Sequence, residues 1–120
     1  MSFGRIIPTL RSFDEAKAKE FYVGFLEFKV DWEHHFEDNT PLYMQISKDG
    51  CVMHLSEHHG DGSPGAQLRI DTDELESFQK HLLARHYKNA RPGIEVPPRG
   101  GREMTIADPF GNRLTFVEIR

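Results

Sequence analysis

Hydrophobic positions recur at helical spacing in two segments of the chain, and strand-like segments surround each of them. In the first segment, Phe21, Tyr22 and Phe25 share one face, which predicts a buried helix face. We expect this helix to run from about Asp14 to Phe25, with Ser12 or Asp14 as its N-terminal cap. The neighbouring residues favour strands at 5–11, 27–34, 42–47 and 51–57.

The second half of the chain repeats this order of elements. Residues 58–65 have the composition of a flexible linker. Beyond them, a second helix is predicted from about 73 to 86. Leu75, Phe78 and Leu82 form its inward face. Further strands are predicted at 66–71, 94–96, 102–107 and 113–119.

The repeated order predicts one α+β domain, residues 1–120, built from two βαβββ modules at about 1–57 and 66–120. Each module has one helix, which covers one face of its sheet. The uncovered faces would form an open, U-shaped mixed sheet, with room for a ligand, a metal or a partner.

Composition narrows the classes of function. The chain has 120 residues, a net charge of −4 and scattered basic residues, so we expect no nucleic-acid partner and allow a cationic ligand. No apolar run approaches the ~20 residues of a membrane span. Cys51 is the only cysteine, and no secretory signal is visible, so we expect a cytoplasmic protein.

The last twenty residues carry the most specific motif. Gly101-Arg102-Glu103 opens a predicted strand, and residues 108–112 (Asp-Pro-Phe-Gly-Asn) form the turn to the next one. This hairpin resembles the closing signature of the vicinal oxygen chelate superfamily, which includes glyoxalases, dioxygenases and bleomycin resistance proteins. The order of elements matches as well, so the resemblance covers nearly the whole chain.

Metal-dependent members of that superfamily have four ligand positions. The resemblance puts them at Ile7, His54, Gly65 (or Ala66) and Thr115 in this chain. Only His54 has a suitable donor, whereas Zn²⁺, Mn²⁺ or Fe²⁺ would need at least three. We therefore expect no metal and no cofactor, which argues against the enzyme branches.

The resemblance is sharper to the bleomycin resistance branch, whose proteins bind the drug without modifying it. It implies a homodimer in which the first strand crosses to the other subunit at Pro8. It also implies that Trp32 and Phe36 lie at the ligand. One departure is that Gly100 stands where these relatives often have tryptophan before Gly101, which disfavours bleomycin itself.

Several candidate residues have two interpretations. Trp32 and Phe36 lie among carboxylates, an arrangement that suits a flat cation, but Trp32 could equally be part of the core. His54 could line the cavity or form structural hydrogen bonds. Glu103 could face the cavity or pair with Arg102. The candidate ligand-binding residues are Trp32, Phe36, Tyr43, His54 and Glu103.

The leading hypothesis is a metal-free, homodimeric binding protein that confers antibiotic resistance by sequestering a flat, cationic drug such as a bleomycin-type glycopeptide. A second hypothesis is a metal-dependent lyase or dioxygenase of the glyoxalase type whose ligands are misaligned here. A third is a dimeric scaffold whose cavity is filled by side chains.

Overall fold

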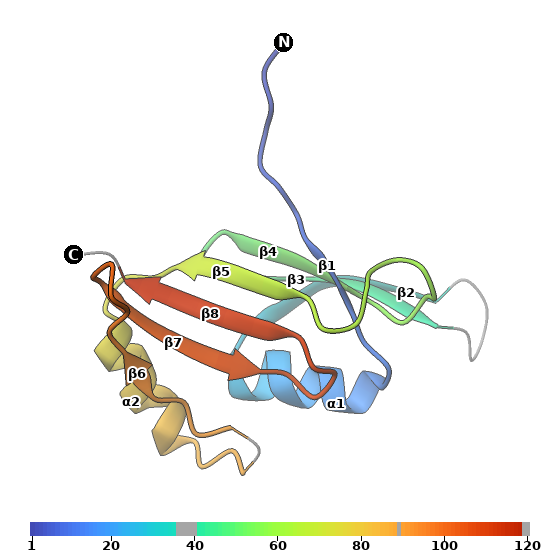
Figure 1. Cartoon of the computed structure of the whole chain (residues 1–120). Helices are drawn as coiled ribbons and strands as arrows, with labels where there is room; N and C mark the ends of the chain where they lie inside the picture. The colour runs from blue at the N-terminus through green and yellow to red at the C-terminus, as the bar shows by residue number, and fades with distance from the viewer. Residues whose placement is uncertain (36–40, 89, 119–120) are drawn as a thin grey trace. The chain divides into compact units, whose positions relative to one another are not determined.

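The computed structural model describes residues 1–35, 41–88 and 90–118 (Figure 1). The chain divides into two compact units, Met1–Pro64 and Gly65–Arg120. In the described residues, each unit holds a four-stranded mixed sheet and its own helical segment. The predicted α+β class and the order of elements are confirmed. No helix in the described ranges is long and apolar enough to cross a bilayer.

The first unit places its strands in the order β1-β4-β3-β2. Strand β1 runs parallel to β4, and the other neighbours are antiparallel. Asp49 and Gly50 form the tight turn between β3 and β4, both at positive φ. The elements are β1 (Thr9–Arg11), α1 (Glu15–Lys19), η1 (Glu20–Phe25), β2 (Lys29–His35), β3 (Leu42–Lys48) and β4 (Cys51–Ser56).

Strand β1 is shorter than the predicted 5–11. It begins at Thr9, directly after Pro8, which has no backbone N–H to donate to a ladder. The Pro8 carbonyl still accepts a hydrogen bond from the His54 backbone N–H at 2.9 Å. The residues before it extend away from the sheet (Figure 1). In this single chain β1 pairs with its own β4, and its exchange with a second subunit stays a prediction.

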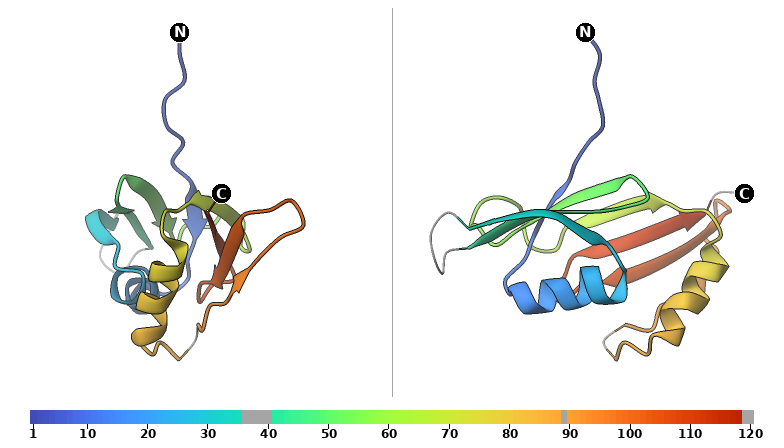
Figure 2. Two further views of the ribbon diagram at one scale, coloured as in Figure 1. Left: turned by 90° about the vertical axis from the view of Figure 1, so that its left-hand side faces the viewer. Right: turned by 180° about the vertical axis from the view of Figure 1, so that it is seen from behind.

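The predicted first helix is present, but it is not regular throughout. Asp14 caps α1, and its carboxylate accepts a hydrogen bond from the Lys17 backbone N–H at 2.9 Å. From Glu20 the helix continues as the π-helix η1. The wider π-turn holds more residues, so Phe21, Phe25 and the following leucine are all buried on one side. Figure 2 shows this helical segment running along one face of its sheet.

The two faces of the first sheet differ in their side chains. Along β3, buried Leu42, Met44 and Ile46 alternate with partly exposed Tyr43 and Gln45. The buried set belongs to the core under α1 and η1, because Glu33, which pairs with Met44, binds Lys19 of α1. Tyr43 and Gln45 therefore lie on the opposite face of the sheet, which no helix in the described part of this unit covers.

The second unit repeats the arrangement with the order β5-β8-β7-β6. Helix α2 packs on β7 and β8. The predicted turn after β7 is confirmed: the Asp108 carboxylate accepts hydrogen bonds from the backbone N–H groups of Phe110 and Asn112, both at 2.8 Å. The elements are β5 (Gln67–Asp71), α2 (Leu75–Ala84), β6 (Ile94–Glu95), β7 (Arg102–Ala107) and β8 (Arg113–Glu118).

Helix α2 starts two residues later than predicted. Glu74 precedes it with φ of 51°, and no side chain of its own segment caps the first turn. Instead, the buried carboxylate of Glu118 on β8 accepts a hydrogen bond from the Leu75 backbone N–H at 2.9 Å. A distant strand therefore supplies the cap that the local sequence lacks.

Candidate functional site

Three of the predicted ligand-binding residues lie together on the uncovered face of the first sheet. Across the strands, Trp32 pairs with Gln45, Gln45 with His54, and His54 with Thr9. Paired residues share a face, so these four side chains form one row. Tyr43 lies two residues before Gln45 on the same face. We call Trp32, Tyr43, Gln45 and His54 the aromatic face.

A β-bulge decides which face Trp32 occupies. Val30 pairs with Ile46 and Trp32 with Gln45, so Asp31 is an extra residue on β2. If β2 continued in regular register without this bulge, Asp31 would pair with Gln45, and Trp32 would pair with Met44 and point toward the helix. Trp32 is 44% exposed. The core interpretation of Trp32 is therefore wrong.

The rings of the aromatic face contact one another. Trp32 and Tyr43 lie 5.9 Å apart between centroids, with planes within 8° of parallel. His54 meets both rings edge-on, at 5.3 Å from Trp32 and 5.2 Å from Tyr43. Such contacts fix ring orientation and leave part of the Trp32 surface exposed to stack on a ligand.

A chain of hydrogen bonds runs beneath these rings. The Tyr43 hydroxyl lies 2.7 Å from His54 Nδ1, and His54 Nε2 lies 3.0 Å from Gln45 Oε1. The Gln45 amide then donates to Asp31 at 3.0 Å, and the Ser47 hydroxyl donates to the same carboxylate at 2.9 Å. The structural interpretation of His54 is supported, because both of its ring nitrogens are hydrogen-bonded. That it also lines a ligand cavity stays a prediction, for which its place on the uncovered face is a requirement.

Asp31 at one end of this chain and His54 in its middle determine the electrostatics of the aromatic face. The hydrogen bond from Gln45, and then that from Ser47, hold the pKa of Asp31 below its ordinary value, so the group is a carboxylate near neutral pH. Desolvation by burial lowers the pKa of His54, which favours the uncharged imidazole. The aromatic face therefore carries a negative charge at one edge and a neutral histidine at its centre.

Glu103 lies in the second unit, on β7, and has a different environment. Its Oε2 atom accepts from Arg69 at 2.7 Å and from Arg99 at 2.9 Å. The bond from Arg69, the largest influence, lowers the pKa of Glu103. The alternative pairing with Arg102 is wrong, because Arg102 binds Glu118. Contact of Glu103 with a ligand stays a prediction, but two arginines already share its carboxylate.

The four positions expected for a metal do not assemble a donor set. Ile7 and Gly65 lie outside the strands, and the buried Thr115 hydroxyl bonds Thr105 at 2.9 Å. On the parallel side, the strand neighbours of His54 and Thr115 are Thr9 and Arg69, neither of which is a usual transition-metal ligand. On the antiparallel side they are Gln45, whose side chain already binds Asp31 and His54, and Thr105. Within the described residues, these positions supply His54 alone as a strong donor.

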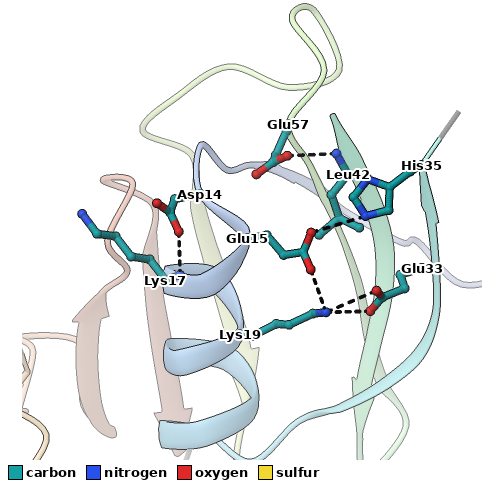
Figure 3. Close-up of polar contacts among 8 residues, drawn as sticks. All are labelled: Asp14, Glu15, Lys17, Lys19, Glu33, His35, Leu42 and Glu57. Atoms are coloured by element: carbon teal, nitrogen blue, oxygen red, sulfur yellow. Dashed lines mark hydrogen bonds and ion pairs between the residues drawn. The ribbon is translucent and has the colours of Figure 1, made fainter. Parts of the chain in front are cut away.

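A separate group of possible ligands lies on the helix side of the first sheet (Figure 3). Within residues 1–35, 41–88 and 90–118, Glu15, Glu33 and His35 are the group whose ligand atoms all lie within 4.8 Å. The Lys19 ammonium already binds Glu15 at 3.0 Å and Glu33 at 2.9 Å. These bonds raise the pKa of Lys19, with the bond to Glu33 as the largest influence. A divalent ion would have to displace this cation.

Gln45 of the aromatic face, and Asp31 beside it, were not predicted from the sequence. Asp31 and Gln45 belong to the site because of the bulge and the strand register, which no local pattern reveals. The alternation of polar and apolar residues along β3 was the one signal that could have indicated Gln45. Phe36, the remaining predicted contact, lies outside the described residues.

Comparisons with known proteins agree with this fold. A family model described as glyoxalase superfamily protein matches residues 1–120. No curated protein sequence matches the chain. A solved member of the glyoxalase/bleomycin resistance protein/dioxygenase superfamily from Sphaerobacter thermophilus is 21% identical, with a TM-score of 0.70, and the match covers 97% of this chain and 98% of that one.

Two other solved structures are named for the drugs they bind. An antibiotic-binding protein from Streptomyces sp. CB03234 is 19% identical, with a TM-score of 0.73 and coverage of 100% of this chain and 99% of that one. A bleomycin-binding protein in complex with bleomycin is 20% identical, with a TM-score of 0.73 and coverage of 98% and 100%. At these identities the likeness shows the shared fold.

Proposed function

We propose that this chain, which belongs to the glyoxalase superfamily, binds and sequesters a flat, cationic small molecule on its aromatic face without transforming it. The observation that carries the proposal is the exposed indole of Trp32, held by a bulge beside an ionised carboxylate. A bleomycin-type glycopeptide, with planar rings and a positive tail, is one ligand of this kind.

Stacking and charge would contribute separately to such binding. An aromatic ligand ring that covers Trp32 removes apolar surface from water and gains stacking energy, by analogy with bases on aromatic side chains about 1–3 kcal/mol. Asp31 supplies a negative charge at the edge of the same face. The net charge of −4 adds a weak, salt-sensitive attraction for cations.

The superfamily contains both binding proteins and enzymes. The number of side chains that could bind a metal distinguishes the two possibilities here. His54 alone among the four expected ligand positions offers a strong donor, and both of its nitrogens already have partners. Three or more ligands are needed to hold a catalytic Zn²⁺. This shortage supports sequestration over metal-dependent lyase or dioxygenase chemistry.

We also propose a cytoplasmic homodimer in which the N-terminal segment crosses to a second subunit. The segment before β1 presents large apolar side chains to solvent: Met1 is 111% exposed, Phe3 91% and Ile6 89%. Side chains of this kind are usually covered in the functional assembly. If the segment crosses to a second subunit at Pro8, these side chains can pack against that subunit.

Calorimetric titration with bleomycin and with 9-aminoacridine, a simpler planar cation, tests the proposed function. Trp32→Ala should weaken binding about 5- to 150-fold, the equivalent of 1–3 kcal/mol. Phe13→Ala is the matched control, because Phe13 is also exposed, at 55%, and precedes α1 rather than lying on the aromatic face. Equal affinity of wild type and Trp32→Ala for both compounds would contradict the proposal.

A further inference from the structure

We infer that the aromatic face selects ligands that carry an N–H donor at the edge of their aromatic plane, and that the Tyr43 oxygen is the acceptor that reads it. The inference rests on the proposed function, because it names the class of cation that the same face would take. Its basis is the direction of the hydrogen-bond chain from Asp31 to Tyr43, which the chemistry of each group determines.

The direction is set at Asp31, because an ionised carboxylate can only accept hydrogen bonds. Gln45 must therefore present its amide nitrogen to Asp31, at 3.0 Å. The opposite amide orientation would set oxygen against oxygen. The Gln45 carbonyl oxygen consequently faces His54 Nε2, at 3.0 Å, and accepts from it.

The same logic continues through the imidazole. A neutral histidine has one N–H, and Gln45 requires that it be on Nε2. Nδ1 is then an acceptor, and the Tyr43 hydroxyl, 2.7 Å away, must donate its only proton to it. The Tyr43 oxygen is left with lone pairs and no proton to offer. Toward a ligand it is an acceptor.

The position of Tyr43 makes this polarity relevant to a stacked ligand. Its ring lies 5.9 Å from that of Trp32, centroid to centroid, and nearly parallel to it. A ligand that covers Trp32 therefore reaches the Tyr43 side chain. A primary amine, amidinium or ring N–H at the ligand edge would meet an acceptor. A fully alkylated cation of the same shape would leave that acceptor without a partner.

Two planar cations separate these cases: 9-aminoacridine has N–H donors, and 10-methylacridinium has none. Fluorescence titration of the wild-type chain should show roughly 10-fold tighter binding of 9-aminoacridine, the equivalent of one hydrogen bond to a charged donor. In Tyr43→Phe both probes should bind by stacking alone, so the ratio of their two dissociation constants should fall to about 1. The affinity for 10-methylacridinium should not fall, because the variant has no acceptor oxygen left without a partner.

Gln45→Met tests the direction of the chain without removing the tyrosine. The variant no longer holds the proton on His54 Nε2, so Tyr43 can accept from His54 instead and turn its own proton outward. The preference for 9-aminoacridine should shrink at least threefold, a change of about 0.7 kcal/mol. A purely structural role of Gln45 would weaken both probes together. This readout also remains if Tyr43→Phe does not fold.

The outcomes separate the two proposals. If neither probe binds, or if Trp32→Ala leaves both affinities unchanged, the proposed function fails. If both probes bind and Trp32→Ala weakens both, but the wild-type ratio is near 1 or survives in Tyr43→Phe, the donor selectivity alone is overturned. A ratio that falls in both Tyr43→Phe and Gln45→Met supports it.

Discussion

Glu118 joins three elements of the second unit, so its replacement should destabilise that unit strongly. The side chain is 3% exposed. One carboxylate oxygen accepts from the Leu75 backbone N–H at 2.9 Å and thereby caps α2. The other accepts from Arg102 Nε at 2.9 Å and from a second nitrogen of the same guanidinium. Strand β8, strand β7 and α2 therefore meet at one carboxylate.

The expected magnitude for Glu118→Gln follows from these bonds. Glutamine has one acceptor oxygen, so in either orientation its NH₂ group faces a donor, from Leu75 or from Arg102. A lost hydrogen bond to a charged group costs about 1.5–3 kcal/mol. Arg102 is 34% exposed, so water can solvate its freed charge. We expect the free energy of unfolding to fall by about 2 kcal/mol rather than by the larger penalty of a fully buried pair.

Urea unfolding followed by circular dichroism measures this change, and amide hydrogen exchange at Leu75 should become faster. Glu76→Gln is the matched control, because Glu76 contacts the same arginine at 3.4 Å but is 57% exposed. It should leave stability unchanged within error. A Glu118→Gln protein as stable as the control would refute the assignment of Glu118 as the cap and buried partner.

Four further outcomes are expected. Asp31→Asn should weaken binding of 9-aminoacridine and flatten its salt dependence, measured by titration at two ionic strengths. Lowering the pH should erase the preference for 9-aminoacridine over 10-methylacridinium. Burial holds the pKa of His54 below its ordinary value, so the preference is complete near neutral pH and is lost as His54 gains a proton. The titratable and charged groups around His54 are Tyr43, His58 beside Tyr43, Asp31 beyond Gln45, and Arg11 on the neighbouring strand. Elemental analysis of untagged protein should find no stoichiometric transition metal, and one tightly bound Zn²⁺ per chain would oppose this. Sedimentation should show a dimer at micromolar concentration that dissociates when residues 1–7 are removed, and a wild-type monomer would exclude the exchanged arm.

Much of the fold could be predicted because alternation and helical spacing report burial directly. The pattern along β3 is the clearest example, since Leu42, Met44 and Ile46 are all buried there. The ends of elements were less predictable, because distant groups set them. Strand β1 starts after Pro8, and α2 starts where Glu118 meets Leu75. Glu118, the acceptor of that last bond, lies outside the helix's own sequence.

The candidate site was predictable in part for the same reason. Trp32, Tyr43 and His54 were identified from residue type and from the family resemblance, and the structure brings them together. Asp31 was not distinguished from its acidic neighbours. Glu33, a carboxylate of the same segment, faces the helix and binds Lys19 instead. Carboxylates that look equivalent in sequence therefore point to opposite faces of one strand.

The bulge on β2 accounts for this difference and links the register of the sheet to the proposed function. Strict alternation would put Val30 and Trp32 on one face, which is the core interpretation of the tryptophan. The bulge at Asp31 breaks this alternation. Val30 therefore pairs with Ile46 on one face, while Trp32 pairs with Gln45 in the row of His54 on the other. Asp31 also supplies the carboxylate that orients Gln45 and, through it, His54 and Tyr43. The bulge thus keeps the stacking surface on the uncovered face, and its extra residue provides the negative charge and, in our proposal, leaves the Tyr43 oxygen as an acceptor toward a ligand.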